Sequence, residues 1–136
     1  MKRLIGCCLP ALLCLSASAL AGTVIYTDSA HRITPSSPDI PVVYLDAPER
    51  MQTDMFGILP SSAPMAEKQA RDVLNSPAFN AQQQQLASAY QGLMKAWSLG
   101  LAKYPAVVFD DKWVVYGTTD VNVATQQLAD WRSANQ

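Results

Sequence analysis

Residues 103–117, KYPAVVFDDKWVVYG, give the clearest indication of the fold. Two short runs rich in β-branched and aromatic residues, Ala106–Phe109 and Trp113–Tyr116, flank the polar segment Asp110–Lys112. Two such runs joined by a short polar turn predict an antiparallel hairpin. Gly117 follows the second run and ends it. The rest of the domain must therefore pack against this hairpin.

Two further strands are expected upstream of the hairpin. The segment Thr23–Thr27 is β-branched and aromatic and predicts a buried strand, and Val42–Leu45 is a second apolar candidate. The intervening 14 residues, 28–41, include three prolines, which exclude a long helix. This length is just sufficient for a crossover between two parallel strands.

Capping residues and apolar periodicity predict the helices. The first begins at Asp46, whose side chain can cap the free N–H groups, and ends at Gly57. Three further helices are expected: Met65–Leu74, about Phe79–Ala102, and a C-terminal helix capped by Thr119 or Asp120.

The long third helix carries two candidate packing faces. Large apolar residues spaced by three or four positions predict the face toward the core, and they are Leu86, Tyr90, Leu93, Trp97 and Leu101. Small residues form a second stripe, which would let another element pack closely, and they are Gly92, Ala96 and Gly100.

The order of elements is strand, irregular crossover, strand, helices, hairpin, helix. It predicts an α/β domain with helices on both sides of a small mixed sheet. This is the thioredoxin-like layout: four strands, of which two are parallel and two form an antiparallel hairpin, with flanking helices and a degenerate first helix. We expect this single domain to occupy residues 22–136.

Residues 1–21 have the three parts of a secretory signal peptide. Lys2 and Arg3 are basic, Leu4–Leu15 is apolar, and the small residues that follow allow cleavage after Ala19 or Ala21. The apolar run is shorter than the roughly 20 residues that span a bilayer, so a retained membrane anchor is the less favoured alternative. We therefore expect an exported protein located in the periplasm, with no stable membrane insertion after cleavage.

Cysteine usage and charge exclude several functions. The three cysteines, Cys7, Cys8 and Cys14, all lie in the predicted signal peptide. The mature chain would thus lack disulfides, thiol–disulfide exchange and thiolate metal ligands. Loss of Lys2 and Arg3 leaves eight basic against eleven acidic residues, with no basic patch for nucleic acid.

The loop after the first strand contains Asp28, Ser29 and His31, the residue types of a hydrolase triad. Three residues within four positions of one loop rarely converge as a triad requires, so capping and loop hydrogen bonds are favoured over catalysis. His31 is the sole histidine, and one imidazole does not build a tight transition-metal site. We predict no catalytic residue, metal or cofactor, and retain these three residues as candidates for protein binding.

The three tryptophans could serve either the core or an interface. Trp97 and Trp131 lie on apolar helix faces, which favours core positions for both. Trp113 begins a strand beside a charged turn and is the better candidate for the surface and for protein binding.

Three parts of the chain together resemble a known family. They are Val24–Ser29, the helical segments Ala89–Gly92 and Ala96–Gly100, and Lys103–Val108 leading to Val114–Gly117. They resemble exported proteins of unknown biochemical activity that integrating conjugative elements encode among genes for type IV secretion and DNA transfer. More distantly, the hairpin with Pro105 is similar to the thioredoxin-like half of conjugative pilus-assembly proteins such as TrbC. The resemblance implies a role in building the mating apparatus and supplies no catalytic residue.

The resemblance also draws attention to Tyr104 and Pro105. In the thioredoxin-like fold the proline before the third strand is cis, and the backbone of the preceding residue is exposed to pair with an extended peptide. The resemblance therefore implies a cis Tyr104–Pro105 bond and a protein-binding role for both residues. The alternative is a trans proline that merely begins a strand.

These observations predict a periplasmic, non-catalytic component of a conjugative DNA-transfer apparatus, a type IV secretion system. Its partners would be other proteins of that apparatus, without direct contact to nucleic acid. The alternative is a chaperone-like module that binds peptides in a thioredoxin-like groove.

Overall fold

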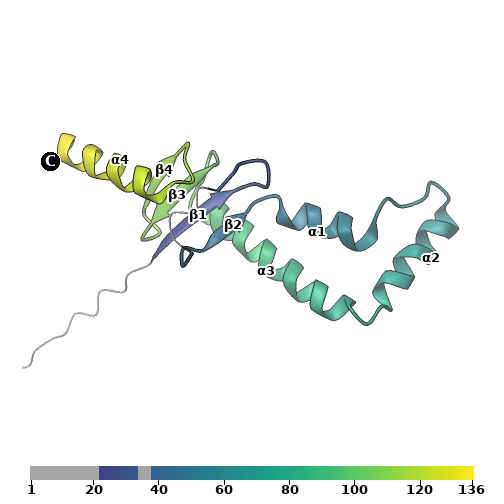
Figure 1. The fold of residues 1–136 in the computed structure, drawn as a ribbon. Coiled ribbons are helices and arrows are strands. Elements are labelled where there is room, and N and C mark those ends of the chain that lie inside the picture. The colour runs from purple at the N-terminus through teal and green to yellow at the C-terminus, as the bar shows by residue number, and fades with distance from the viewer. Residues whose placement is uncertain (1–21, 34–37) are drawn as a thin grey trace, which may run out of the picture.

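A computed structural model describes residues 22–33 and 38–136 of the chain, and the predicted signal peptide lies outside them. The described residues form one mixed sheet of four strands and four helices (Figure 1). Their bounds are β1 Thr23–Thr27, β2 Val42–Tyr44, α1 Ala47–Phe56, α2 Ala63–Leu74, α3 Phe79–Ser98, β3 Ala106–Phe109, β4 Trp113–Tyr116 and α4 Val121–Ala134.

The strands lie in the order β2-β1-β3-β4. β1 runs parallel to β2, with Ile25 opposite Val42, and antiparallel to β3, with Ile25 also opposite Val107. β3 and β4 form the predicted antiparallel hairpin, with Phe109 opposite Trp113. The predicted mixed sheet of two parallel strands plus a hairpin is confirmed.

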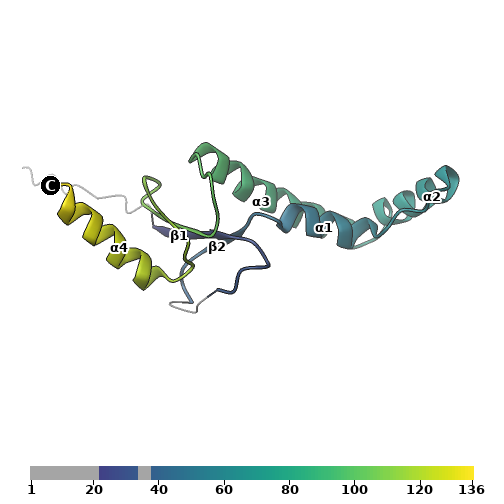
Figure 2. The ribbon, with the colours of Figure 1, turned by 90° about the horizontal axis from the view of Figure 1, so that it is seen from above.

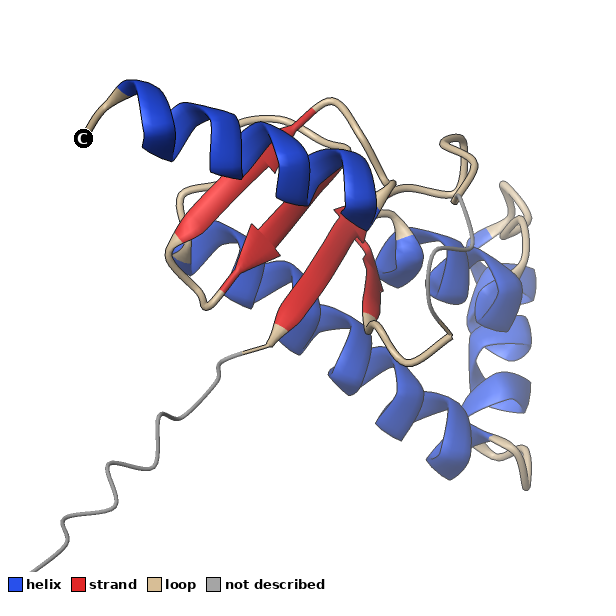
Figure 3. Cartoon of the chain, turned by 60° about the vertical axis from the view of Figure 1, so that its left-hand side comes forward, coloured by secondary structure: helices blue, strands red, loops and turns tan. Residues whose placement is uncertain are grey.

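Alternation along the central strands divides the core between the two faces of the sheet. On one face Ile25 and Val107 pack with Ala124 of α4. On the other face Tyr26 and Val108 pack with Ala96 of α3. Figure 3 shows α4 crossing one face of the sheet and α3 running behind the other. Helices on both sides of the sheet, as predicted, enclose β1 and β3.

The small residues of α3, rather than its large ones, face the sheet. Ala96 is fully buried, and Gly92 lies so close to β2 that an added Cβ would be 2.8 Å from Cγ1 of Val43. The predicted core face is wrong at Tyr90 and Trp97, which are 40% and 70% exposed. Close approach of the helix to the sheet turns these two rings outward.

The ends of α3 and α4 have local causes. α3 ends at Ser98, earlier than the predicted Ala102, and Gly100 follows with a φ of 68°. Gly100 therefore terminates the helix and is not part of the small-residue stripe. At the start of α4 the Asp120 side chain accepts hydrogen bonds from the amides of Asn122 and Val123, which confirms the predicted cap.

The helices α1, α2 and the first half of α3 form an arm that projects from the sheet (Figure 2). α1 packs along α3, and Gln69 of α2 donates a hydrogen bond of 2.7 Å to the Phe56 carbonyl at the end of α1. α2 has no buried residue. The arm thus depends on few internal contacts beyond the α1–α3 packing.

Candidate functional site

The loop that follows β1 is held by Asp28. Its Oδ1 atom accepts hydrogen bonds from the backbone amides of Ala30 at 3.1 Å and His31 at 3.0 Å. The same oxygen lies 2.5 Å from Nδ1 of His31. The hydrogen bond from the His31 side chain is the largest influence on the pKa of Asp28 and lowers it below the usual value. The loop therefore carries an ionised carboxylate at the end of the central strand.

Asp46 joins this loop to the beginning of α1. Both of its carboxylate oxygens lie 3.2 Å from the Ser29 amide, and the Ser29 hydroxyl also donates to it. Arg50 forms an ion pair with Asp46 at 3.2 Å. Partial burial would raise the pKa of Asp46, but the bonds from Ser29 together with Arg50 lower it. The predicted capping role is wrong, because this side chain makes no capping hydrogen bond and reaches back across the crossover.

The side chains of Asp28, Ser29 and His31 are not arranged as a hydrolase triad. A nucleophilic serine needs a hydrogen bond to its histidine base. Here the Ser29 hydroxyl donates to Asp46, while His31 contacts Asp28. The serine and the histidine therefore each bond to a different carboxylate, as expected for a hydrogen-bonded loop.

Tyr104 and Pro105 lie beside this loop. The bond between them is cis, as the resemblance implies. The Tyr104 ring meets the His31 ring edge-on, with 6.0 Å between the centroids and an interplanar angle of 89°, and Tyr104 is 52% exposed. The structure thus brings together Asp28, Ser29, His31, Tyr104 and Pro105.

Trp113, the remaining candidate, lies elsewhere. It pairs with Phe109 at the far end of β3, whereas Pro105 directly precedes that strand. The prediction that Trp113 is the most exposed of the three tryptophans is wrong: it is half-buried, less exposed than Trp97 and Trp131, and packs against Trp131 at 5.5 Å between ring centroids. The predicted core position of Trp131 is wrong, since it is 52% exposed.

A groove of about 350 Å³ lies between the loop, α1 and the end of α3. We name it the Tyr104 groove, and it is lined by Asp28, Leu45, Asp46, Glu49, Leu93, Ala96, Trp97, Leu101, Ala102, Lys103 and Tyr104. Trp97 is the most exposed large hydrophobic side chain in its lining. Residue patterns did not predict that Trp97, Asp46 and Glu49 would line a groove. Trp97 is predicted in the core because it is part of the apolar stripe of its helix.

Charged groups of both signs surround the Tyr104 groove. The carboxylates of Asp28, Asp46 and Glu49 and the ammonium group of Lys103 line it. Asp46 is paired with Arg50 at 3.2 Å, and Asp28 lies 2.5 Å from Nδ1 of His31. The groove therefore combines exposed aromatic rings with carboxylates.

The comparison with protein families identifies the chain. A family model described as "Protein of unknown function (DUF1525)" matches residues 20–134. The chain belongs to this DUF1525 family. No curated protein and no solved structure matches it.

Two further properties of this DUF1525 protein concern residues 22–33 and 38–136. Over these residues, no helix has the length and apolar character needed to cross a membrane. The same part of the chain contains no group of three or more histidine, cysteine, aspartate or glutamate residues arranged to hold a metal ion.

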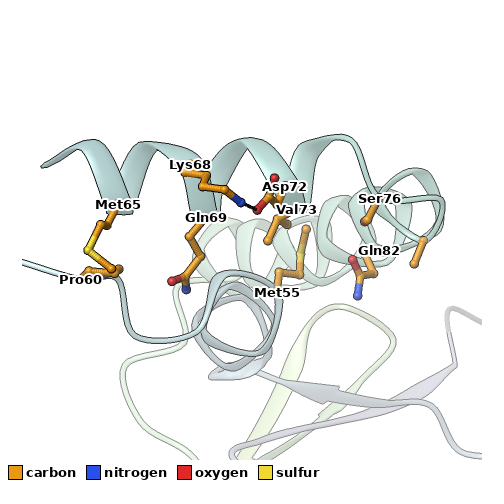
Figure 4. A pocket seen from close by; sticks show the side chains of 10 residues that line it. Met55, Pro60, Met65, Lys68, Gln69, Asp72, Val73, Ser76 and Gln82 are labelled. Carbon is orange, nitrogen blue, oxygen red and sulfur yellow. Dashed lines mark hydrogen bonds and ion pairs between the residues drawn. The ribbon is translucent and has the colours of Figure 1, made fainter. Parts of the chain in front are cut away.

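The DUF1525 protein has a larger cavity, about 590 Å³, inside the helical arm (Figure 4). Met55 and Met65 line it, and its charged pair, Lys68 and Asp72, is joined at 2.7 Å. The Met65 side chain points toward Pro60 in Figure 4. None of the candidate residues lies here, so the Tyr104 groove is the better candidate for the functional site.

Proposed function

We propose that this protein is a thioredoxin-like, periplasmic and non-catalytic component of a conjugative DNA-transfer apparatus, a type IV secretion system. It acts by contacts with other proteins of that apparatus. Trp97 carries the proposal: a tryptophan 70% exposed in a groove, next to an exposed tyrosine. Tryptophan and tyrosine are enriched among the residues that dominate binding energy at interfaces.

The strand arrangement supports the thioredoxin-like part of the proposal. The order β2-β1-β3-β4, with β1 and β2 parallel and β3–β4 a hairpin, is the one that this layout requires. The loop after β1, where redox members carry their cysteine pair, holds Asp28, Ser29 and His31 instead. A domain of this kind without thiols retains the groove and is suited to binding.

Crosslinking in donor cells tests the proposal. A photoreactive amino acid at position 97 should capture one defined protein of the transfer apparatus in stoichiometric amount. The matched control is position 91, an exposed glutamine of the same helix that does not line the groove. Equal capture at both positions, or no captured protein, would contradict the proposed binding role of the Tyr104 groove.

A Trp97→Ala variant extends this test to function. The side chain is largely exposed, so the variant should unfold within a few degrees of the wild type, because surface substitutions typically change stability by less than about 0.5 kcal/mol. Conjugation frequency should fall at least about tenfold, as expected for an interface anchor worth more than about 1.4 kcal/mol. Unchanged transfer with normal expression would remove the groove from the mechanism.

The alternative, a chaperone-like module that binds peptides, draws on the same exposed rings and on the openness of the groove to extended chains. It predicts weak capture of many unfolded proteins at position 97 in place of one defined partner. The number of captured species therefore distinguishes the two functions.

A further inference from the structure

β4 is the outer strand on one side of the sheet. Its inner edge pairs with β3 over Trp113–Tyr116. Within the part of the chain that the structure describes, no backbone hydrogen bond uses its outer edge. A free strand edge offers N–H and C=O groups to an added strand, and main-chain hydrogen bonds then contribute affinity.

A groove of about 370 Å³ runs between this strand and α4. We name it the Trp113 groove, and it is lined by Trp113, Val114, Val115, Tyr116, Gln127, Leu128 and Trp131. Trp131 remains half exposed and packs against Trp113 with an angle of 53° between the ring planes. The groove lies beside the free edge, so an added strand could place alternate side chains in it.

Two cations frame the Trp113 end of this groove. The ammonium nitrogen of Lys112 and the guanidinium carbon of Arg132 each lie 5.0 Å from the Trp113 ring centroid. Neither residue forms an ion pair within residues 22–33 and 38–136, whereas the neighbouring Asp111 is paired with Lys95 at 2.7 Å. Both cations therefore remain available to an acidic group placed beside Trp113.

We propose that the Trp113 groove is a second protein-binding site, which takes an extended segment of a partner protein as a strand added to β4. The segment alternates apolar and acidic residues, with an acidic residue beside Trp113. A second copy of this chain fits less well, because its β4, Trp113–Tyr116, has no acidic residue to place beside Lys112 and Arg132. The Trp113 end of this site lies at the turn of the hairpin, whereas at its other end the Tyr116 hydroxyl accepts a hydrogen bond from the amide of Ala102, which lines the Tyr104 groove.

Peptide binding to the purified protein tests the proposal. The probes are two seven-residue peptides that alternate valine with either glutamate or lysine. Amide chemical shifts are followed by nuclear magnetic resonance during titration. The glutamate peptide should shift the amides of residues 113–116 and bind at least about tenfold more tightly than the lysine peptide at low salt, because two ion pairs turn into two repulsions. Equal binding of both peptides, or shifts confined to other residues, would overturn the proposal.

A charge-neutral variant provides the second measurement. The double substitution Lys112→Gln and Arg132→Gln should remove the tenfold preference while leaving the fold intact, since both side chains are exposed. The matched control neutralises Lys68→Gln and Arg71→Gln on α2 and should retain the preference. If the control variant lost the preference for the glutamate peptide to the same extent, net charge would explain that preference. If the protein formed a dimer at equilibrium through β4, the partner at this strand edge would be a second copy of the chain. Either result would refute the proposed site.

Discussion

The contact between Gly92 and Val43 gives the most direct test of how α3 lies on the sheet. A Cβ at position 92 would meet Cγ1 of Val43 at 2.8 Å, closer than ordinary van der Waals contact. Val43 is β-branched and sits on the edge strand β2, so its rotamer has little freedom to yield. We therefore expect the Gly92→Ala substitution to push α3 away from the sheet.

Two opposing terms determine the size of the effect. Alanine favours the helix over glycine by about 1 kcal/mol, while overpacking a tight contact costs about 1–3 kcal/mol. The net expectation is a destabilisation of about 1 kcal/mol. For a domain of this size that lowers the midpoint of thermal unfolding by roughly 4 °C.

Thermal and denaturant unfolding of a double-mutant cycle with Val43→Ala measures the contact itself. Removal of the valine methyl groups should relieve most of the cost of the alanine, with a coupling energy of about 1 kcal/mol. Gln91→Ala, on the exposed side of the same turn, is the control and should change stability by less than about 0.5 kcal/mol. A Gly92→Ala protein that unfolds at a higher temperature than the wild type would refute the packing argument.

Three other predictions concern the site, α4 and the hairpin turn. The pKa of Asp46 is lowered in the folded state, so its contribution to stability is present above the unfolded pKa and is lost as pH falls below about 4; Asp46→Asn should flatten this dependence in acid denaturation. Leu128→Ala should cost about 2–3 kcal/mol in urea unfolding, because this buried side chain attaches α4 to the sheet. Asp110→Gly should raise the unfolding temperature by a few degrees, since Asp110 has a φ of 54°, and the steric strain that glycine relieves there exceeds the entropy that it loses on folding. Unchanged stability of Leu128→Ala would contradict the packing contact of α4, and unchanged stability of Asp110→Gly would contradict the backbone cost at position 110.

Local chemistry was readable without the structure. The hairpin follows from two β-branched runs on either side of an acidic turn, and Asp110 and Asp111 indeed take the left-handed conformations that such turns need. Asp120 caps α4 as its position before an apolar run predicts. Asp28 and His31 are three positions apart in the same loop, so their contact is a local one. Each of these features depends on neighbours in sequence.

The orientation of α3 could not be read in this way. Periodicity gives two stripes on one helix, and burial of large apolar groups favours the stripe that contains Trp97. The short distance between α3 and β2 selects the small stripe instead, because Gly92 and Ala96 alone permit that approach. This choice depends on interaxial distance, a property of the packed molecule, and it moves Trp97 from the expected core into the Tyr104 groove.

Residue patterns sufficed to predict the strands, the helices with most of their ends, and the absence of thiols after residue 14. The role of Asp46 depends on the folded chain, because Asp46 lies 17 residues from Ser29 and bonds to that loop in place of capping its own helix. The tertiary structure also decided which tryptophans are exposed. Contacts between residues distant in sequence form only when the sheet brings the ends of β1, β2 and β3 together, and residue spacing alone carries no information about that meeting.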